Sequence, residues 1–277
     1  MSGAPGGPVL AARGICKTYI DKATGDEVEA LRGASVTVNC HEFVSVIGPS
    51  GCGKSTFLRI VAGLARPSGG EILVEGRRVS GPGADRGMVF QEYALFPWKT
   101  TLGNVEFGLR LKGVPRPERE RTARHYIDLV GLGGFEDKYP RQLSGGMRQR
   151  AAVARALANQ PAVLLMDEPF AAVDALTRLR LQEELTQIWQ RERMTVLFVT
   201  HSIDEAIFPA DRVVALSKRP GTVQREFTVD LPRPRRWEPL ANDARFSALR
   251  MDRLLLRPIE TRTVMRWGLM REGVEAA

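Results

Sequence analysis

The chain has 277 residues, of which 43% are hydrophobic and 26% charged, a composition that fits a globular protein and excludes disordered and fibrous classes. Its formal net charge of +8 would attract a nucleic acid, an anionic membrane surface or an anionic ligand as a binding partner. The charge alone does not choose among these partners. The cysteines Cys16, Cys40 and Cys52 form no CxxC pair, so the sequence indicates neither a disulfide framework nor a zinc site.

The start of the sequence is rich in Gly and Pro, and we expect residues 1–8 to be disordered. It lacks the apolar stretch of a secretory signal. No run reaches the roughly 18 to 20 apolar residues that a membrane-spanning helix needs. We therefore expect the chain to stay in the cytoplasm, with its cysteines reduced.

The first third of the sequence predicts a β-layer followed by a strand, a loop and a helix. Residues 36–38 alternate apolar and polar side chains, and so do residues 71–75, which predicts a small antiparallel layer. Between them, the apolar run 43–47 leads through a Gly-rich turn into residues 57–64, whose apolar side chains share one helical face.

The later part predicts a helical segment inside an α/β core. Residues 118–157 have a helical and polar-rich pattern, whereas 162–166 and 196–199 are continuous apolar runs of strand length. Such runs suit strands buried on both faces of a parallel sheet. Residues 231–277 are rich in Pro and Arg and then weakly helical, so we expect a peripheral, solvated basic tail with short helices.

The strongest local signal is a phosphate-binding loop between the strand 43–47 and the next helix. Its glycines let successive N–H groups point at phosphate oxygens, while Lys54 reaches the β- and γ-phosphates of a nucleotide and Ser55 offers a hydroxyl to Mg²⁺. The alternative is a flexible surface loop. The residues that match the pattern G-x4-G-K-S are Gly48, Pro49, Ser50, Gly51, Cys52, Gly53, Lys54 and Ser55, followed by Thr56.

Two adjacent carboxylates, Asp167 and Glu168, follow the apolar run 162–166. Ligands of open α/β sheets bind beyond the carboxyl ends of the strands, which places both acids beside the phosphates. One carboxylate can hold Mg²⁺ and the next can act as general base on the attacking water. The alternative is that both acids cap the following helix.

A second anion site is predicted at Ser144, Gly145 and Gly146, which precede an Ala-rich helical stretch. Free N–H groups at a helix start and the serine hydroxyl can all face one phosphate. Taken alone, the same residues fit an ordinary helix cap.

The segment 143–146 resembles the signature motif of ABC transporter ATPases, and the phosphate loop, signature and acidic pair follow in the order of that family. The resemblance covers about residues 9–229. It implies an α/β fold with a RecA-like P-loop NTPase core (9–91 and 160–230), an N-terminal antiparallel β-layer and an inserted α-helical subdomain (92–159). Together these form an ATPase domain over 9–230.

The resemblance assigns roles to four further residues. Gln91 is similar to the glutamine that touches Mg²⁺ and links the site to the helical subdomain, and Tyr19 to the aromatic residue that stacks on adenine. Asp174 is similar to the D-loop aspartate, and His201 to the switch histidine that contacts the γ-phosphate. The alternatives are that Tyr19 belongs to the core and that His201 is structural.

Two positions depart from the family pattern. The D-loop reads Ala171-Ala-Val-Asp174, where the family often has Ser-Ala-Leu-Asp, so any role of that serine hydroxyl is lost. Ser202 follows the switch histidine where Asp is common, and with Glu205 it predicts a capping box for the next helix.

The stretches 87–98, 170–177 and 204–208 resemble the ATPases of importers for nitrate, alkanesulfonates and taurine. That group works with a permease and an extracytoplasmic substrate-binding protein. Residues 96–98, Phe-Pro-Trp, either help to form the groove that receives the permease or pack within the helical subdomain.

The resemblance implies a homodimer with ATP and Mg²⁺ at its interface, on the cytoplasmic face of the membrane, with Glu168 as base for hydrolysis. The alternatives are a soluble ABC-type ATPase that acts on nucleic acid or in translation, an ABC ATPase for another cargo, and a non-hydrolysing sensor. The printed sequence holds no recognisable nucleic-acid module, so we expect no nucleic-acid partner. Nothing in it selects the cargo.

Overall fold

The computed structural model describes residues 7–21 and 23–251. Most of the N-terminal segment that we expected to be disordered, and the tail beyond Met251, lie outside these ranges. Among the described residues, none of the helices combines the length and apolar character that crossing a membrane requires.

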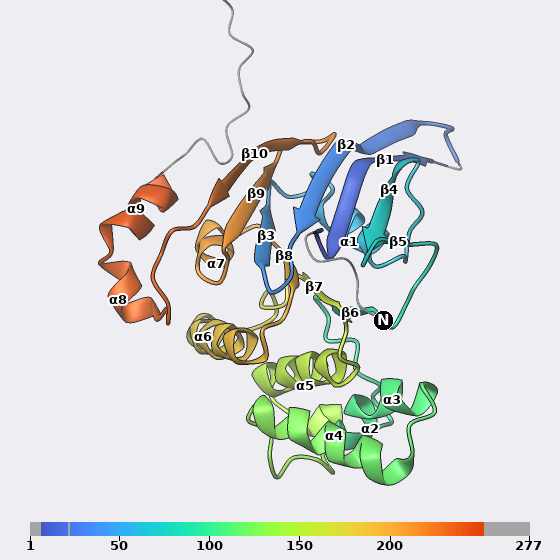
Figure 1. The fold of residues 1–277 in the computed structure, drawn as a ribbon, viewed down its shortest axis with the longest axis vertical. Helices are drawn as coiled ribbons and strands as arrows, with labels where there is room; N and C mark the ends of the chain where they lie inside the picture. Colours follow the sequence, from blue (N-terminus) through green and yellow to red (C-terminus); the bar gives the residue numbers. More distant parts are fainter. Residues whose placement is uncertain (1–6, 22, 252–277) are drawn as a thin grey trace, which may run out of the picture.

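The predicted antiparallel layer exists, with the strand order β2-β1-β4-β5 (Figure 1). Its two predicted strands do not pair with each other but flank β1, which sequence patterning missed. The reason is local, because register shifts along β1 interrupt the alternation of buried and exposed side chains. The strands are β1 (Leu10–Ile20), β2 (Glu27–Val38), β4 (Gly69–Val74) and β5 (Arg77–Arg78).

The second sheet has the order β10-β9-β3-β8-β7-β6 and is parallel except for β10, which runs antiparallel to β9. Every residue of β3, β7 and β8 is buried, as the continuous apolar runs predict. The strands are β3 (Phe43–Ile47), β6 (Arg86–Val89), β7 (Val163–Asp167), β8 (Val196–Thr200), β9 (Arg212–Leu216) and β10 (Val223–Thr228).

Two buried apolar clusters lie on opposite faces of the parallel sheet. One lies between the two sheets and includes the inner face of α1 (Lys54–Val61). The other lies against α5 (Gly145–Ala158), α6 (Ala175–Glu192) and α7 (Ile203–Ile207). The parallel sheet is therefore covered on both faces, which fixes the positions of its strand ends.

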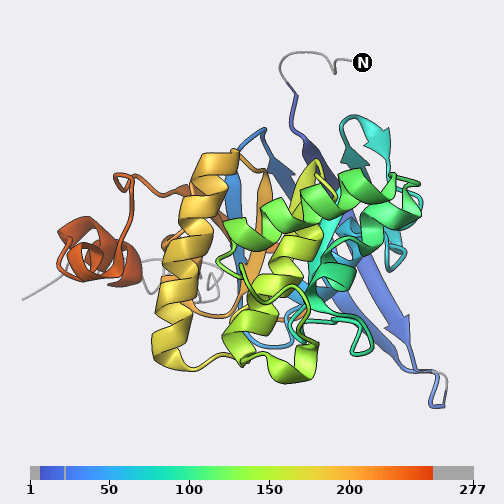
Figure 2. The same ribbon diagram turned by 90° about the horizontal axis from the view of Figure 1, so that it is seen from below.

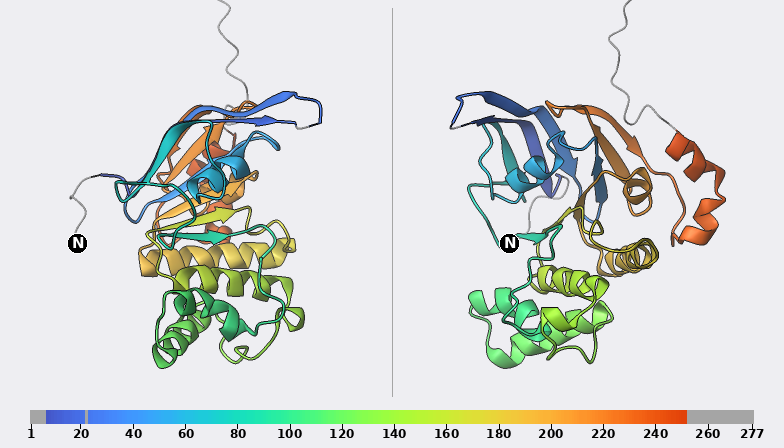
Figure 3. Two further views of the ribbon diagram at one scale, coloured as in Figure 1. Left: turned by 90° about the vertical axis from the view of Figure 1, so that its right-hand side faces the viewer. Right: turned by 180° about the vertical axis from the view of Figure 1, so that it is seen from behind.

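Four helices form a separate layer below the sheets, as Figures 2 and 3 show from other directions. They are α2 (Thr101–Val105), α3 (Phe107–Leu111), α4 (Arg116–Leu129) and α5, with a 3₁₀ turn at Pro140–Gln142. These elements fall within residues 92–159. The subdomain boundaries themselves stay a prediction.

The described part of the basic tail contains two short helices, α8 (Trp237–Ala241) and α9 (Ala244–Met251), and the prediction of a solvated surface is wrong for Arg235. Arg235 is only 2% exposed, and its guanidinium donates to the carbonyls of Phe208 and Ala210 at 2.9 and 2.7 Å. The ring of Trp237 stacks on Phe208, with centroids 4.1 Å apart.

The average charge of the segment misled this prediction, because an arginine whose two terminal nitrogens donate to carbonyls can be buried. Burial lowers the pKa of Arg235 to about 10, which leaves its guanidinium charged at neutral pH.

Candidate functional site

A cavity of about 310 Å³ opens at the carboxyl end of β3 and contains the predicted phosphate loop. Ligands of open α/β sheets bind at this edge. Eight of its lining residues carry sequence predictions, whereas Val28, Ala30 and Arg219 do not. The lining residues are Tyr19, Val28, Ala30, Ser50, Gly51, Gly53, Lys54, Ser55, Thr56, Glu168 and Arg219.

The glycines of the phosphate loop are required by its backbone. Gly51 and Gly53 have φ angles of 73° and 105°, which L side chains rarely adopt. Gly53 precedes α1 and offers no side-chain cap, so the first-turn N–H groups of the helix remain open to an anion. Cys52 is packed inside, and burial raises the pKa of its thiol. The flexible-loop alternative does not fit this enclosed geometry.

Lys54 is 5% exposed, and its Nζ donates to the carbonyl oxygens of Gly48 and Pro49 at 2.7 and 3.0 Å. These bonds fold the loop around the ammonium group. Within the described ranges no carboxylate forms an ion pair with Lys54, which leaves its positive charge for a bound anion.

The Ser55 hydroxyl donates to Oδ1 of Asp167 at 2.8 Å, which joins the start of α1 to the end of β7. Burial raises the pKa of Asp167, and the hydrogen bond from Ser55 opposes that shift. A hydroxyl and a carboxylate are hard oxygen donors of the kind that Mg²⁺ accepts beside phosphate oxygens. No group of three or more His, Cys, Asp or Glu residues that could hold a metal occurs in the described chain, so these oxygens would need the nucleotide to complete a site.

Glu168 and His201 come from the neighbouring strand ends of β7 and β8, and His201 Nδ1 lies 3.0 Å from Glu168 Oε2. The Glu168 backbone has a φ of 43°, and its N–H donates to the Val199 carbonyl at 2.9 Å, which fixes the direction of its side chain. Asp174, not the acidic pair, caps the next helix, α6. The capping alternative for the two acids is therefore wrong.

Tyr19 lines the cavity and is 44% exposed, which excludes the core alternative. Its hydroxyl lies 3.5 Å from Thr56 Oγ1, and Lys17 Nζ lies 4.9 Å from its ring centroid. The ring is therefore held beside the phosphate loop, in a place where a planar base can stack on it.

Several predicted residues are not part of the lining. Asp167 and His201 are hydrogen-bonded to the lining residues Ser55 and Glu168, but three other groups have no such bond. Gln91 is exposed and is not among the lining residues. Ser144 caps α5 by accepting from Met147 N at 3.2 Å, and Asp174 caps α6 by accepting from Thr177 N at 3.0 Å.

The last two groups lie side by side. A Cβ on Gly146 would come within 2.9 Å of the Thr177 methyl carbon. A Cβ on Gly145 would lie 3.3 Å from the hydroxyl oxygen of Tyr93. Within the described chain the structure therefore brings residues 144–146 and 174–177 together, but away from the phosphate loop.

The capping box predicted after His201 is only half present. Ser202 accepts from Glu205 N at 3.4 Å, but the Glu205 carboxylate accepts from the Thr200 hydroxyl at 2.7 Å instead of returning to Ser202 N. The predicted pattern was right for the cap and wrong for the reciprocal bond, because the buried Thr200 hydroxyl competes for the carboxylate.

The two alternatives for residues 96–98 apply to different side chains. Phe96 packs on Phe107, with ring centroids 4.6 Å apart, within the helical layer. Trp98 is 71% exposed. Phe96 also lines a surface cavity of about 590 Å³ between β6 and the helices α3 and α5, together with Leu111 and Arg155.

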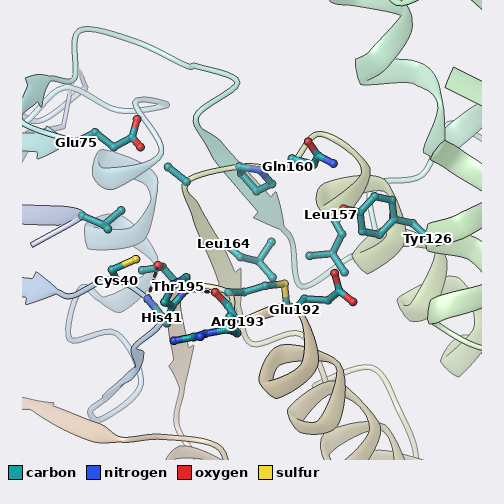
Figure 4. Close-up of a pocket in the computed structure, with 14 residues that line it drawn as sticks. Cys40, His41, Glu75, Tyr126, Leu157, Gln160, Leu164, Glu192, Arg193 and Thr195 are labelled. Carbon is teal, nitrogen blue, oxygen red and sulfur yellow. Dashed lines mark hydrogen bonds between the residues drawn. The ribbon is translucent and has the colours of Figure 1, made fainter. Parts of the chain in front are cut away.

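Another cavity, of about 380 Å³, lies at the opposite, amino-terminal ends of β3, β7 and β8 (Figure 4). Its lining mixes the acids Glu75 and Glu192 with Arg193, and the His41 N–H donates to the Thr195 hydroxyl at 3.0 Å. It has neither a Gly-rich turn nor a free ammonium group, so it does not offer a phosphate site comparable to the first cavity.

Comparisons with known proteins agree on one family. The sequence profile of the family described as ABC transporter matches residues 31–171. The chain is 57% identical to an uncharacterized ABC transporter ATP-binding protein of Methanocaldococcus jannaschii, over 79% of this chain and 82% of that protein. It is 56% identical to the nitrate import ATP-binding protein NrtD of Synechocystis, over 74% of this chain and 77% of that one.

Another relative is the taurine import ATP-binding protein TauB of Roseobacter denitrificans, 46% identical over 73% of this chain and 76% of that protein. Among solved structures, the fold is similar to a dimeric ATP-binding cassette in a post-hydrolysis state with ADP and phosphate. The TM-score is 0.70 at 33% identity, over 80% of this chain and all of that one. The predicted RecA-like fold with its β-layer and inserted helices is confirmed.

Proposed function

The chain belongs to the ABC transporter ATP-binding family, and we propose that it is the ATP-hydrolysing subunit of an importer that energises a separate permease. The observation that carries this proposal is one cavity where a phosphate loop meets two polar pairs, Ser55 with Asp167 and Glu168 with His201. Relatives named for nitrate and taurine import support a small anionic or zwitterionic cargo of that kind.

Nucleotide binding follows from the shape and charge of the cavity. The open N–H groups at the start of α1 and the Lys54 ammonium hold the β- and γ-phosphates. The Tyr19 ring stacks on the adenine at the other end. Ser55 and Asp167, with Gln91, would hold a Mg²⁺ ion, which neutralises charge on the phosphates.

Hydrolysis is assigned to Glu168. Its carboxylate lines the cavity and accepts the proton of a water molecule that attacks the γ-phosphate in line. His201, bonded to Glu168, orients the carboxylate and contacts the γ-phosphate. Both side chains come from adjacent parallel strands, so their separation is set by the sheet.

Dimerisation explains why Ser144–Gly146 lie outside the cavity. We propose that two copies associate head to tail, so that the α5 start of one chain completes the phosphate site of the other. The dimeric cassette among similar structures supports this arrangement. Asp174, beside these residues at the start of α6, would lie at the same interface.

Coupling to the permease is assigned to the helical layer. Gln91 begins the segment that leads from β6 into residues 92–159, so a change at the γ-phosphate can move these helices relative to the sheets. Trp98 and the cavity beside Phe96 provide an exposed apolar surface for the permease at the cytoplasmic face of the membrane.

The test is an ATPase assay of the purified chain, alone and reconstituted with a permease encoded beside it. We expect Mg²⁺-dependent hydrolysis that a cargo and its binding protein stimulate in the complex. Absence of hydrolysis in both preparations would contradict the proposal. No described feature favours the nucleic-acid alternative, and two of the relatives are named as import ATP-binding proteins.

A further inference from the structure

A short loop after β9, residues 217–222, is fixed against the nucleotide cavity. The N–H of Gly221 donates to the Ala30 carbonyl at 2.9 Å, and the Gly221 carbonyl accepts from Arg32 N at 3.0 Å. A Cβ at Gly221 would collide with the Cys52 carbonyl of the phosphate loop. The loop is therefore held between β2 and the phosphate loop by its backbone.

The loop is also closed on itself. The Ser217 hydroxyl accepts from Thr222 N at 2.9 Å and lies 2.8 Å from the Pro220 carbonyl. These bonds restrict the backbone on both sides of Arg219. The side chain of Arg219 therefore starts from a defined position.

The Arg219 side chain lines the nucleotide cavity and is exposed. No hydrogen bond or ion pair of its guanidinium occurs within residues 7–21 and 23–251. Arg212, at the start of the preceding strand β9, by contrast pairs with Glu42. Arg219 is thus a charged fork with five donors that faces the cavity without a protein acceptor.

We propose that Arg219 is a second cationic contact for the nucleotide and pairs with a phosphate that ATP and ADP share. The inference rests on the proposed binding of ATP in this cavity. A guanidinium matches phosphate oxygens in geometry and charge. It adds to Lys54, which lines the same cavity and already donates to the carbonyls of Gly48 and Pro49.

The position of the loop 217–222 indicates that Arg219 contacts an inner phosphate of the nucleotide and not the γ-phosphate. The loop is bonded to Ala30, and Ala30 and Val28 line the cavity together with Tyr19, the residue for the base. The γ-phosphate belongs at the acidic end, beside Glu168 and the pair of Ser55 with Asp167. Arg219 therefore contacts the part of the nucleotide next to the ribose.

The test measures dissociation constants for ATP and ADP by calorimetry, with Mg²⁺, on the full chain. We expect Arg219→Ala to weaken both nucleotides by the same factor, about fivefold to twentyfold, since an exposed charged contact is partly screened. Arg219→Lys should lie between the wild type and Arg219→Ala. Lys218→Ala is the matched control, since Lys218 is exposed, adjacent and not part of the lining.

Three results would overturn the inference. Unchanged affinities in Arg219→Ala would exclude a contact, and a loss for ATP alone would assign Arg219 to the γ-phosphate. An equal loss in Lys218→Ala would show a general effect of surface charge. The melting temperature without nucleotide should not change, because Arg219 has no described partner to lose. Failure of the wild type to bind either nucleotide would instead contradict the proposed function.

Discussion

The starts of α1 and α5 are built from similar residues but have different surroundings. Both helices begin at Gly-rich segments with a serine nearby. The start of α1 has no side-chain cap and faces a cavity lined by Lys54 and Glu168, whereas Ser144 caps α5 and lies outside that cavity. We therefore propose that one chain suffices to bind a nucleotide, and that the start of α5 acts on the nucleotide of a second copy.

The largest expected effect is on hydrolysis within the cavity. Replacing Glu168 by Gln removes the base but keeps the size and hydrogen bonding of the side chain, so we expect the ATPase rate to fall about hundredfold to ten-thousandfold. ATP binding should remain, and the closed dimer should accumulate with ATP. Light scattering with and without ATP, beside a phosphate-release assay, measures both. Substantial steady-state turnover in this variant would remove Glu168 from the role of base.

The next effect is on binding at α1. Lys54→Ala removes the buried ammonium and its two loop contacts, so we expect ATP affinity to fall about tenfold to hundredfold. Calorimetry on the full chain measures it, with Lys218→Ala as the control for charge. An unchanged affinity would mean that α1 is not the primary nucleotide site, and the comparison between the helices would lose its basis.

A third effect lies outside both helix starts. Arg235→Ala leaves buried carbonyls at the end of α7 without donors, and we expect the free energy of unfolding to fall by about 1 to 3 kcal/mol. Urea unfolding measures the change. Arg236→Ala, at the exposed neighbour, should cost less than about 0.5 kcal/mol. Equal free energies of unfolding of the two variants would show that the contacts of Arg235 do not stabilise the fold, as expected for a solvated surface.

The same variants also separate stability from binding. ATP affinity should be unchanged in Arg235→Ala at a temperature where the variant is folded, because Arg235 contacts α7 and not the cavity. A weakened affinity would show that α7 transmits the loss to His201, which precedes the N-cap residue Ser202 of that helix.

The sequence predicted best where one short segment carries both structure and chemistry. Residues 48–56 predicted strand end, loop and helix together, because each glycine and Lys54 has a local reason for its position. Prediction from the sequence failed where contacts with residues distant in the sequence determine the burial of a side chain or the pairing of a strand. Arg235 donates to the carbonyls of Ile207, Phe208 and Ala210, which lie 25 to 28 residues earlier in the sequence. No local sequence pattern predicts these contacts.

The contribution of Arg219 was missed for a related reason. It lies about 160 residues from the phosphate loop in sequence, and only the bonds of Gly221 to β2 bring it to the cavity. Register shifts in β1 hid that strand in the same way, since alternation is readable only in regular pairing. The sequence therefore shows which residue types are present, but it does not show which distant segments pair with one another.

The smallest expected effect tests α5 itself. Ser144→Ala removes the cap of α5 and the hydroxyl for the partner's phosphate, so we expect the ATPase rate to fall about tenfold. The ATP affinity of the monomer should not change, because Ser144 is outside the cavity. Thr100→Ala is the matched control: it removes the side-chain cap of α2 in the same helical layer, which costs about 1 kcal/mol of stability.

These two variants separate capping from a role at a dimer interface. If both lose similar stability but only Ser144→Ala loses hydrolysis, the hydroxyl acts on a phosphate beyond its own helix. If Ser144→Ala weakens ATP binding by the isolated monomer, α5 reaches the nucleotide within one chain. The two helix starts would then form a single site, and a second copy would not be needed to complete it.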